Sequence, residues 1–350
     1  MRVKNKLFLL TVLIGILPVI AAGCDKKAYS REKGQEADFL SCSDFLLNTI
    51  VTIQLYDKQE PALLDGCFRM IEQYELICSR TDPSSELASL NDKSLHEKNP
   101  KGNSYVLSAY LTDVIDKGLY YSRLTDGAFD LSIAPVTDLW SFQTEPPQLP
   151  DKKALKMALD LVDYRNISLK DNRITFAKPG IRIDLGAIAK GYIADRVKDY
   201  LLANGVKSAI INLGGNILCV GTKPDGTGFH IGIQKPYADR NETLAVMDIK
   251  DLSVVSSGVY ERFFKLDDVL YHHILDPSTG YPCRNGLLAV TIISKKSVDG
   301  DGLSTACFAL GLEKGTKLIE SLPDTYAAFI TEDGKLHYTK GFSDAIPINP

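Results

Sequence analysis

Strand-like and helical segments follow one another irregularly along this chain, and this irregular order limits the folds that it can adopt. Residues 49–56 (TIVTIQLY) are rich in β-branched side chains and predict a strand, and apolar residues at helical spacing follow over 62–78 and 106–122. A fold built of βαβ units needs one crossover helix after each strand. Here two helices follow the first strand, and strand-like segments later come in direct succession at 209–213, 229–233 and 243–249. The order predicts the α+β class, with mixed sheets and helices.

Further elements of both kinds are expected in the rest of the chain. They are a helix over 154–162, a strand pair around the turn Asp171–Asn172 that 182–185 closes, a helix over 186–202, a strand over 287–293 and a helix over 303–310. From about residue 45 onward, about 300 residues remain, which is enough for one large domain or two closely joined ones.

The first residues predict export from the cytoplasm. Arg2, Lys4 and Lys6 precede an apolar run, LFLLTVLIGILPVIAAG, that ends in small residues as secretory signal peptides do. A proline interrupts this run, and its apolar core is too short for a typical spanning helix. The run stops at Cys24 in the sequence AAGC, which resembles a bacterial lipobox. We expect residues 1–23 to be a lipoprotein signal peptide and Cys24 to carry the lipid, palmitate included; an ordinary cleaved signal and an uncleaved anchor are the alternatives.

A polar stretch separates this segment from the folded part. Residues 24–43 contain DKKAYSREKGQEAD, which has no apolar period, and they predict a flexible tether. The folded domain is expected over 44–350. Two or more acyl chains hold a protein stably at a membrane. The expected location is therefore outside the cytoplasm, on the periplasmic face of an inner membrane or the outer face of a single membrane.

Charge and cysteine content narrow the class of protein. The chain has 40 Lys and Arg against 44 Asp and Glu, a formal net charge of −4, and its lysines are scattered, which argues against a nucleic-acid surface. Of its seven cysteines, the six other than Cys24 form no CxxC pair. Cys67, Cys78, Cys219 and Cys307 lie in apolar stretches and are expected to be buried thiols rather than disulfides or zinc ligands.

The stretch DGDGLSTACF (299–308) places a carboxylate and a hydroxyl, Asp301 and Thr305, four residues apart at the start of an apolar helix. Residues at i and i+4 share one helix face. Hard cations such as Mg²⁺ take such oxygens together with water and phosphate oxygens. A glycine on each side of Asp301 lets a backbone or a phosphate approach. The alternative is a helix N-cap, in which Asp301 or Ser304 accepts a first-turn N–H; both can hold together.

A second candidate site is DLGAIAKGY (184–192). A short strand is expected to end at Asp184, Gly186 permits a tight turn, and a helix opens with Lys190 in its first turn. Free N–H groups at a helix start and a lysine charge both favour phosphate oxygens. The spacing is not that of a P-loop. The alternative is a surface lysine on a packed helix.

Two of the five histidines, His272 and His273, stand together before the turn Asp276–Gly280. Adjacent residues of a strand point to opposite faces, so we expect one of them to face a site and the other not. A single histidine of near-neutral pKa is a plausible general base. The alternative is a histidine that hydrogen bonds satisfy in the fold.

A glycine-led loop offers an aromatic ring next to a carboxylate. It reads Gly127-Ala128-Phe129-Asp130. Aromatic residues are usually core, but one beside an aspartate in such a loop could serve a planar ring.

These segments, in this order, resemble the ApbE family of FAD:protein FMN transferases. The matching pieces span the chain from about residue 45 onward. They are SRTDPSSELASLN (79–91), DGAFDLSIAPVTDLWSF (126–142), DLGAIAKGYIAD (184–195), NLGGN (212–216), SSGVYERFF (256–264), HHILDPSTGYP (272–282) and DGLSTACFALG (301–311). The resemblance implies an ApbE-like fold, related to the T-fold, with FAD in a cleft between two subdomains and its pyrophosphate on Mg²⁺.

The resemblance also implies roles for individual residues. FMN would pass from FAD to a threonine hydroxyl of an acceptor protein, with release of AMP; an acceptor with an FMN-binding domain, of redox-pump or extracellular electron-transfer type, is expected. His273 would be the base. The cation ligands would be the Ala187 carbonyl, the Asp301 carboxylate and the Thr305 hydroxyl, so that Asp301 serves catalysis through the cation. Contacts with FAD would come from Leu47, Thr81, Ala128, Phe129, Asp130, Asp184, Lys190 and Leu275.

The sequence departs from the family pattern in two places. Leu47-Asn48-Thr49 stands where Met-Gly-Thr is common, and Thr81 stands where a Tyr or Asn is common. A smaller residue at 81 could admit water, so an FAD pyrophosphatase that yields FMN and AMP is one alternative. A flavin-binding lipoprotein is another.

Overall fold

The computed structural model describes residues 29–33, 38–96, 103–142, 146–239 and 242–349. The expected signal peptide and Cys24 lie outside these residues. Within them, no helix is both long and apolar enough to cross a membrane.

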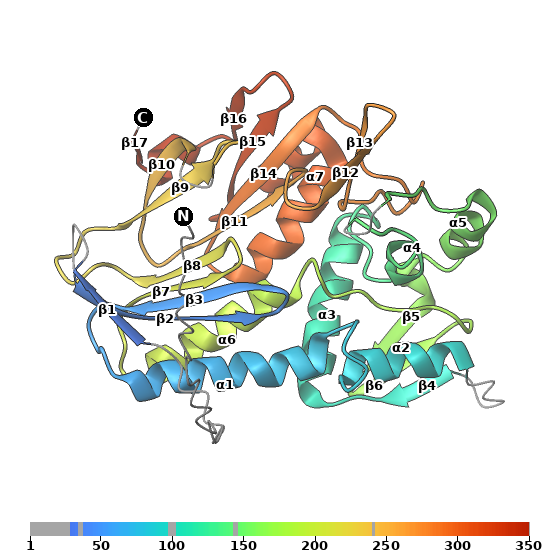
Figure 1. The fold of residues 1–350 in the computed structure, drawn as a ribbon, viewed down its shortest axis with the longest axis horizontal. Helices are drawn as coiled ribbons and strands as arrows, with labels where there is room; N and C mark the ends of the chain where they lie inside the picture. The colour runs from blue at the N-terminus through green and yellow to red at the C-terminus, as the bar shows by residue number, and fades with distance from the viewer. Residues whose placement is uncertain (1–28, 34–37, 97–102, 143–145, 240–241, 350) are drawn as a thin grey trace, which may run out of the picture.

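A nine-stranded sheet forms the centre of the fold (Figure 1). Every neighbouring pair in this sheet is antiparallel, so no crossover helices are needed. The predicted α+β class with mixed sheets and helices is confirmed. In spatial order the strands are β1 (Tyr29–Lys33), β2 (Asp38–Leu46), β3 (Thr49–Leu55), β7 (Ser208–Leu213), β8 (Asn216–Gly221), β11 (Ser253–Gly258), β14 (Leu287–Ser294), β15 (Tyr326–Thr331) and β16 (Leu336–Tyr338).

Both faces of the central sheet are covered. Helices α1 (Pro61–Cys78), α6 (Ala189–Ala203) and α7 (Ser297–Glu320) pack on one face and share the main hydrophobic core with it. A three-stranded sheet of β9 (Phe229–Gln234), β10 (Thr243–Ile249) and β17 (Ile348–Asn349) closes the other face with a second core. Strand β14 reads LLAVTIIS and contributes to both cores, which explains its continuous apolar sequence.

A smaller body lies beside this layered one (Figure 1). A two-stranded hairpin of β12 (Phe263–Leu266) and β13 (Val269–His272) adds to a third apolar cluster around Trp140. A short α8 (Phe342–Ala345) precedes β17. The smaller body contains α2 (Glu86–His96), α3 (Ala109–Leu124), α4 (Ala134–Thr137), α5 (Lys152–Leu159), a short 3₁₀ turn (Tyr164–Asn166) and a sheet of β4 (Asn103–Val106), β6 (Arg173–Phe176) and β5 (Ile167–Lys170).

The expected tether differs from the structure. Strand β1 and the first part of β2 fall within residues 24–43, so the folded domain begins before residue 44. Phe39, Leu40 and Cys42 of β2 are buried. Sequence pattern missed β1 because YSREK, as an edge strand, carries polar residues throughout and is held by its backbone ladder to β2.

The helix expected over 303–310 is longer than predicted. It begins at Ser297, and its regular geometry is interrupted at Gly311, whose φ is 78°. The side chain that accepts its first N–H groups is Asp195, on α6, whose two carboxylate oxygens accept from Ser297 N (2.8 Å) and Val298 N (3.0 Å). A cap that comes from so far along the chain leaves no local signal, which explains the error.

Six cysteines, at positions 42, 67, 78, 219, 283 and 307, are free and buried. The prediction of buried thiols is confirmed for Cys67, Cys78, Cys219 and Cys307. Burial raises the pKa of each of these four thiols to about 12, so they stay protonated and unreactive.

The buried Asp195 generates a prediction about stability and pH. Burial raises its pKa to about 6, against an ordinary value of 3.8, although its two backbone hydrogen bonds oppose the rise. The folded state therefore holds a proton between pH 4 and 6 that the unfolded state releases, and this contribution to stability is lost as pH rises through 6. Across this pH range we expect the free energy of unfolding of Asp195→Asn to vary by about 2 kcal/mol less than that of the wild type.

The measurement is chemical unfolding of both proteins at pH 4.5 and pH 7. The stability advantage of the wild type over Asp195→Asn should be larger at pH 4.5. An equal advantage at the two pH values would contradict the raised pKa.

Candidate functional site

Asp301 lies at the centre of the candidate site. Its side chain is only 5% exposed. One carboxylate oxygen accepts from Asn216 Nδ2 at 2.9 Å and the other from Gly191 N at 2.5 Å. Burial raises the pKa of Asp301, while the charge of Lys190 and these two hydrogen bonds favour the anion. Two neutral donors and one neighbouring amine leave a buried carboxylate that a cation would stabilise further.

The two neutral oxygens of the predicted cation site belong to the two segments that meet at Asp301. Ala187 precedes Ile188, the N-cap residue of α6, so its carbonyl lies outside the helical hydrogen bonds, while the free first-turn N–H of Gly191 donates to Asp301. Thr305, one turn beyond Asp301 on α7, has its hydroxyl 3.3 Å from the hydroxyl of Ser257. A carbonyl, a carboxylate and a hydroxyl form a donor set that suits Mg²⁺, with further ligands from substrate.

The described residues contain no group of three or more His, Cys, Asp or Glu side chains that could hold a metal. This excludes, for that part of the chain, a site built wholly of such side chains. A set with one carboxylate and two neutral oxygens is a weak cation site alone and needs phosphate oxygens to complete it.

Lys190 links the two candidate catalytic groups. Its positive charge favours the Asp301 anion and lowers the pKa of His273. Among residues that the structure describes, Lys190 has no hydrogen-bond or ion-pair partner. An unpaired amine in the first turn of α6, close to a histidine and a carboxylate, is placed to bind an anionic group.

The two adjacent histidines have different surroundings, as expected. His272 is 5% exposed, and both ring nitrogens are used: Nε2 lies 2.9 Å from the Cys283 carbonyl and Nδ1 accepts from Ile274 N. His273 is half-buried, with Nδ1 3.3 Å from the Arg262 carbonyl. A carbonyl only accepts, so Nδ1 carries the proton and Nε2 keeps a free lone pair. His273 alone can act as a base.

Asp184 belongs to a chain of four charged side chains. Arg80 Nε lies 3.3 Å from Asp184 Oδ2, Arg80 also contacts Asp138, and Asp138 contacts Arg182. The other Asp184 oxygen accepts from Gly186 N at 2.8 Å. The network ties the loop after α1 to the loop after α4 and to the start of the 184–192 segment.

The glycine-led loop is held mainly from within. Asp130 Oδ1 accepts from Ser132 N and Ser132 Oγ, and Oδ2 accepts from Tyr164 N. Phe129 is 4% exposed, its N–H donates to Thr125 Oγ1 at 3.0 Å and its ring lies edge-on to Tyr121 at 6.1 Å, so the ring is packed in the core rather than presented to a planar ligand. The Leu131 carbonyl accepts from Asp184 N at 2.8 Å, which brings this loop, Ala128 included, beside the 184–192 segment.

Three of the predicted FAD-contact residues, Leu47, Thr81 and Leu275, lie on segments other than those that contact Asp301. Leu47 and Asn48 form the tight β2–β3 turn with φ of 55° and 56°, and Leu47 N donates to Glu75. Thr81 is exposed beside Arg80. Leu275 is buried in the cluster around Trp140. These positions are not joined to Asp301 by any described hydrogen bond.

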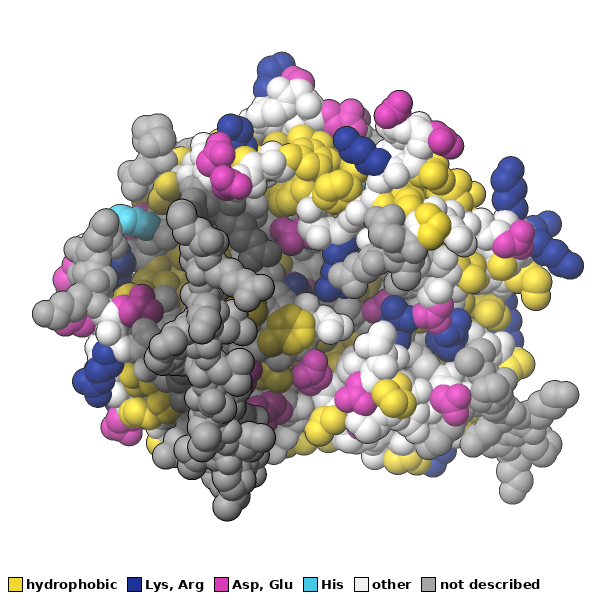
Figure 2. All heavy atoms as spheres, in the orientation of Figure 1, with side chains coloured by type: hydrophobic (Ala, Val, Ile, Leu, Met, Phe, Trp, Pro, Cys, Tyr) yellow, Lys and Arg dark blue, Asp and Glu magenta, His cyan; other side chains and the backbone are white. Residues whose placement is uncertain are grey.

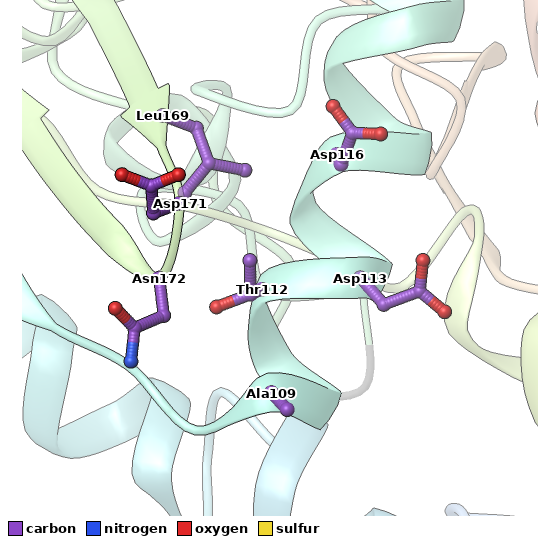
Figure 3. A pocket seen from close by; sticks show the side chains of 7 residues that line it. All are labelled: Ala109, Thr112, Asp113, Asp116, Leu169, Asp171 and Asn172. Carbon is purple, nitrogen blue, oxygen red and sulfur yellow. The ribbon is translucent and has the colours of Figure 1, made fainter.

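Two surface hollows lie elsewhere. One, of about 410 Å³, lies between α3 and the β5–β6 turn (Figure 3) and is lined by Ala109, Thr112, Asp113, Asp116, Leu169, Asp171 and Asn172. The other, of about 380 Å³, is lined by residues that include Tyr121 and Asp299. Neither contains a predicted site residue. Figure 2 shows the surface also hollowed between the layered body and the smaller one, with basic and acidic side chains beside it.

Sequence reasoning missed the partners that hold the site residues. Asn216 holds Asp301 and also accepts from Ser297 Oγ at 2.6 Å, and Arg80 pairs with Asp184. Asn216 ends the NLGGN segment, which was a usable signal because asparagine after paired glycines often stands at a turn. Arg80 carried no signal in its own segment.

Comparisons with known proteins agree on one family. The model of the ApbE family matches residues 47–330. The chain is 32% identical over 358 residues to a FAD:protein FMN transferase of Treponema pallidum, covering 96% of this chain and 95% of that one. It is 36% identical over 295 residues to a protein of the same name from Klebsiella pneumoniae, covering 84% and 89%.

Solved structures give the same result for the fold. The ApbE protein of Thermotoga maritima superposes with a TM-score of 0.78 at 30% identity, over 87% of this chain and 98% of that one. The flavin transferase ApbE of Vibrio cholerae gives a TM-score of 0.77 at 26% identity, over 88% and 99%.

The ion network around Asp184 generates a prediction about stability. Arg80, Asp138 and Asp184 have side chains only 24%, 29% and 17% exposed. Arg80→Ala should lower the free energy of unfolding by about 1–3 kcal/mol, because it leaves two partly buried carboxylates short of a partner. The control is Arg165→Ala, which removes a 72% exposed arginine paired with Asp163 and should change stability by less than about 1 kcal/mol. Equal losses in urea unfolding would contradict the network.

Proposed function

This chain belongs to the ApbE family, as its motifs predicted, and we propose that it transfers FMN from FAD to a threonine hydroxyl of an acceptor protein in a Mg²⁺-dependent reaction that releases AMP. Its relatives show that it is a flavin transferase. Dependence on Mg²⁺ and transfer to a threonine are what we propose in addition. The observation that supports the cation is the buried Asp301 carboxylate, which two neutral donors hold and which the charge of Lys190 favours as an anion.

The cation would be held by the Ala187 carbonyl, Asp301 and Thr305. When bound, Mg²⁺ supplies Lewis-acid stabilisation of charge on the pyrophosphate. Asn216 and Gly191 fix the two Asp301 oxygens in one orientation, so the carboxylate needs no rearrangement. Lys190 would bind a phosphate oxygen from the side of α6.

His273 would take the proton of the attacking hydroxyl on Nε2. A bond forms between the threonine oxygen and the phosphorus of the FMN part, the bond from that phosphorus to the bridging oxygen breaks, and AMP leaves with the electron pair. The Arg262 carbonyl holds Nδ1–H and so fixes the ring orientation. Positioning and electrostatics then supply most of the rate.

The remaining contacts with FAD are proposed from the family pattern. They involve Ala128, Phe129, Asp130 and Asp184, together with Leu47, Thr81 and the backbone near Leu275. We also propose the lipid anchor at Cys24, a location outside the cytoplasm, and an acceptor with an FMN-binding domain.

Hydrolysis of FAD to FMN and AMP is the second candidate. Thr81 is small and exposed beside the Asp184 network, which favours entry of water where a larger residue would exclude it. The two reactions share every other group and differ only in the nucleophile. A flavin-binding lipoprotein without catalysis is the third candidate.

The test of transfer is incubation with FAD, Mg²⁺ and a purified protein that carries an FMN-binding domain, followed by mass spectrometry of the acceptor. We expect FMN on one threonine and one AMP for each. Asp301→Ala should lower transfer at least about 100-fold. The control is Asp299→Asn on the same helix, whose carboxylate pairs with Tyr121 and which should retain activity. AMP without modified acceptor would favour hydrolysis, and FAD binding without AMP would favour a binder.

The surroundings of His273 generate a prediction about pH. Burial lowers the pKa of His273 from 6.5 to about 4, and the charges of Arg262 and Lys190 act in the same direction. The neutral ring is the active form, so kcat/KM for the acceptor should hold through pH 6.5 and fall as pH drops through about 4. His273→Ala should lower kcat about 10²–10⁴-fold and leave FAD affinity within about threefold.

His337→Ala is the matched control, because His337 contacts Thr331 on β15 and lies outside the site. An acid limb near pH 6.5 in the wild type, or one that persists in His273→Ala, would contradict the assignment of His273 as the base.

A further inference from the structure

Three aromatic side chains form a cluster on the surface beside the proposed site. They are Tyr237 in the β9–β10 loop, Tyr260 between β11 and β12, and Phe263 on β12. The Tyr237 ring lies 6.0 Å from that of Tyr260 and 5.9 Å from that of Phe263, edge-on to both. Tyr237 is 53% exposed and Phe263 36% exposed. Figure 2 shows hydrophobic side chains gathered over β14 and the connection from β11 to β12.

Tyr237 has an unusual backbone conformation. Its φ is 60°, in the left-handed region that a bulky side chain rarely adopts. Every other described non-glycine residue with positive φ is Asn or Asp, apart from Leu47. A loop that needed only to turn would be more stable with Gly or Asn here. The fold therefore holds a half-exposed ring at a strained position, and strain of this kind concentrates at functional surfaces.

Tyr260 lies on residues 257–262, the segment that joins the two halves of the proposed site; Phe263 follows it directly, and Tyr237 contacts both rings. At one end of this segment, the Ser257 hydroxyl lies 3.3 Å from that of Thr305. At the other end, the Arg262 carbonyl accepts from His273 N at 3.1 Å. Between them the Tyr260 ring folds over Gly258, where a Cβ would lie 2.7 Å from it. A molecule that delivers a hydroxyl to His273 arrives next to this segment, because the Arg262 carbonyl contacts the His273 ring at 3.3 Å.

We propose that Tyr237, Tyr260 and Phe263 form the docking surface for the acceptor protein, and that apolar residues flanking its threonine fill this surface. The proposal rests on the proposed function, which requires a protein as second substrate. Exposed Glu261, Arg262 and Lys265 provide a polar rim around an apolar centre, as protein interfaces have. Half-buried tyrosines provide large contact area at low entropic cost and are frequent binding hot spots.

The experiment compares Tyr237→Gly, Phe263→Ser and the control Tyr110→Ser with the wild type. Tyr110 is 57% exposed at the start of α3, against a ring of α1. The acceptor is a purified protein with an FMN-binding domain, and its KM, kcat, FAD affinity and AMP release without acceptor are measured. Each cluster variant should raise the acceptor KM about tenfold and leave kcat and FAD affinity within about twofold. Tyr237→Gly should also unfold at the same or a higher temperature, because it relieves the strained φ. The control should change none of these.

Each other outcome has a distinct meaning. An unchanged acceptor KM in an enzyme that transfers FMN would overturn the docking surface and leave the proposed function in place. A loss of FAD affinity would assign the rings to the flavin, and a wild-type dimer that the variants dissociate would assign them to a second copy; either overturns the proposal. Absence of FMN on the acceptor with the wild type would overturn the proposed function and the docking surface together.

Discussion

The close crossing of α6 and α7 is the contact on which the rest of the candidate site depends. At Gly191 a Cβ would lie 2.2 Å from the Ser297 carbonyl, so only glycine allows the two helices to approach this far. The same approach lets Gly191 N–H reach Asp301 and lets Asp195 cap the first turn of α7. One backbone contact thus positions a carboxylate and fixes the helix that carries Thr305.

The electrostatic arrangement follows from this packing. A carboxylate as buried as Asp301 favours its neutral form, and the charge that favours its anion is that of Lys190, one residue before Gly191. Burial, with a smaller contribution from the charge of the same amine, lowers the pKa of His273 to about 4, so its ring is an uncharged base at neutral pH. An anionic substrate that pairs with Lys190 would reduce the effect of the lysine charge on Asp301 and His273. A cation that arrives with the substrate would then replace the lysine charge at Asp301. Substrate and cation are therefore expected to bind cooperatively.

Local pattern predicted the elements whose residues carry their own signal. The strands at 209–213 and 243–249 and the helix at 62–78 show clear apolar periods and were found nearly at their true bounds. Pattern failed where the determinant lies elsewhere in the chain: the start of α7 depends on Asp195, 102 residues earlier, and β1 depends on its ladder to β2. The site divides in the same way. Asp301, Lys190, His273 and Asn216 all stand in recognisable segments, but no local pattern indicates that Asn216 holds a carboxylate 85 residues further along the chain.

The low pKa of His273 bears on how the enzyme would choose between a protein hydroxyl and water. A histidine with a pKa of about 4 is a weak base, so it cannot generate a nucleophile unless the hydroxyl is held against Nε2 while charge develops on the oxygen. Water gains nothing from surfaces beyond the site, whereas a threonine carried by a docked protein arrives with its orientation already fixed by distant contacts. A weak base therefore slows attack by water more than attack by the acceptor hydroxyl. Selectivity for transfer over hydrolysis then resides in the contacts that hold the acceptor rather than in the strength of the base.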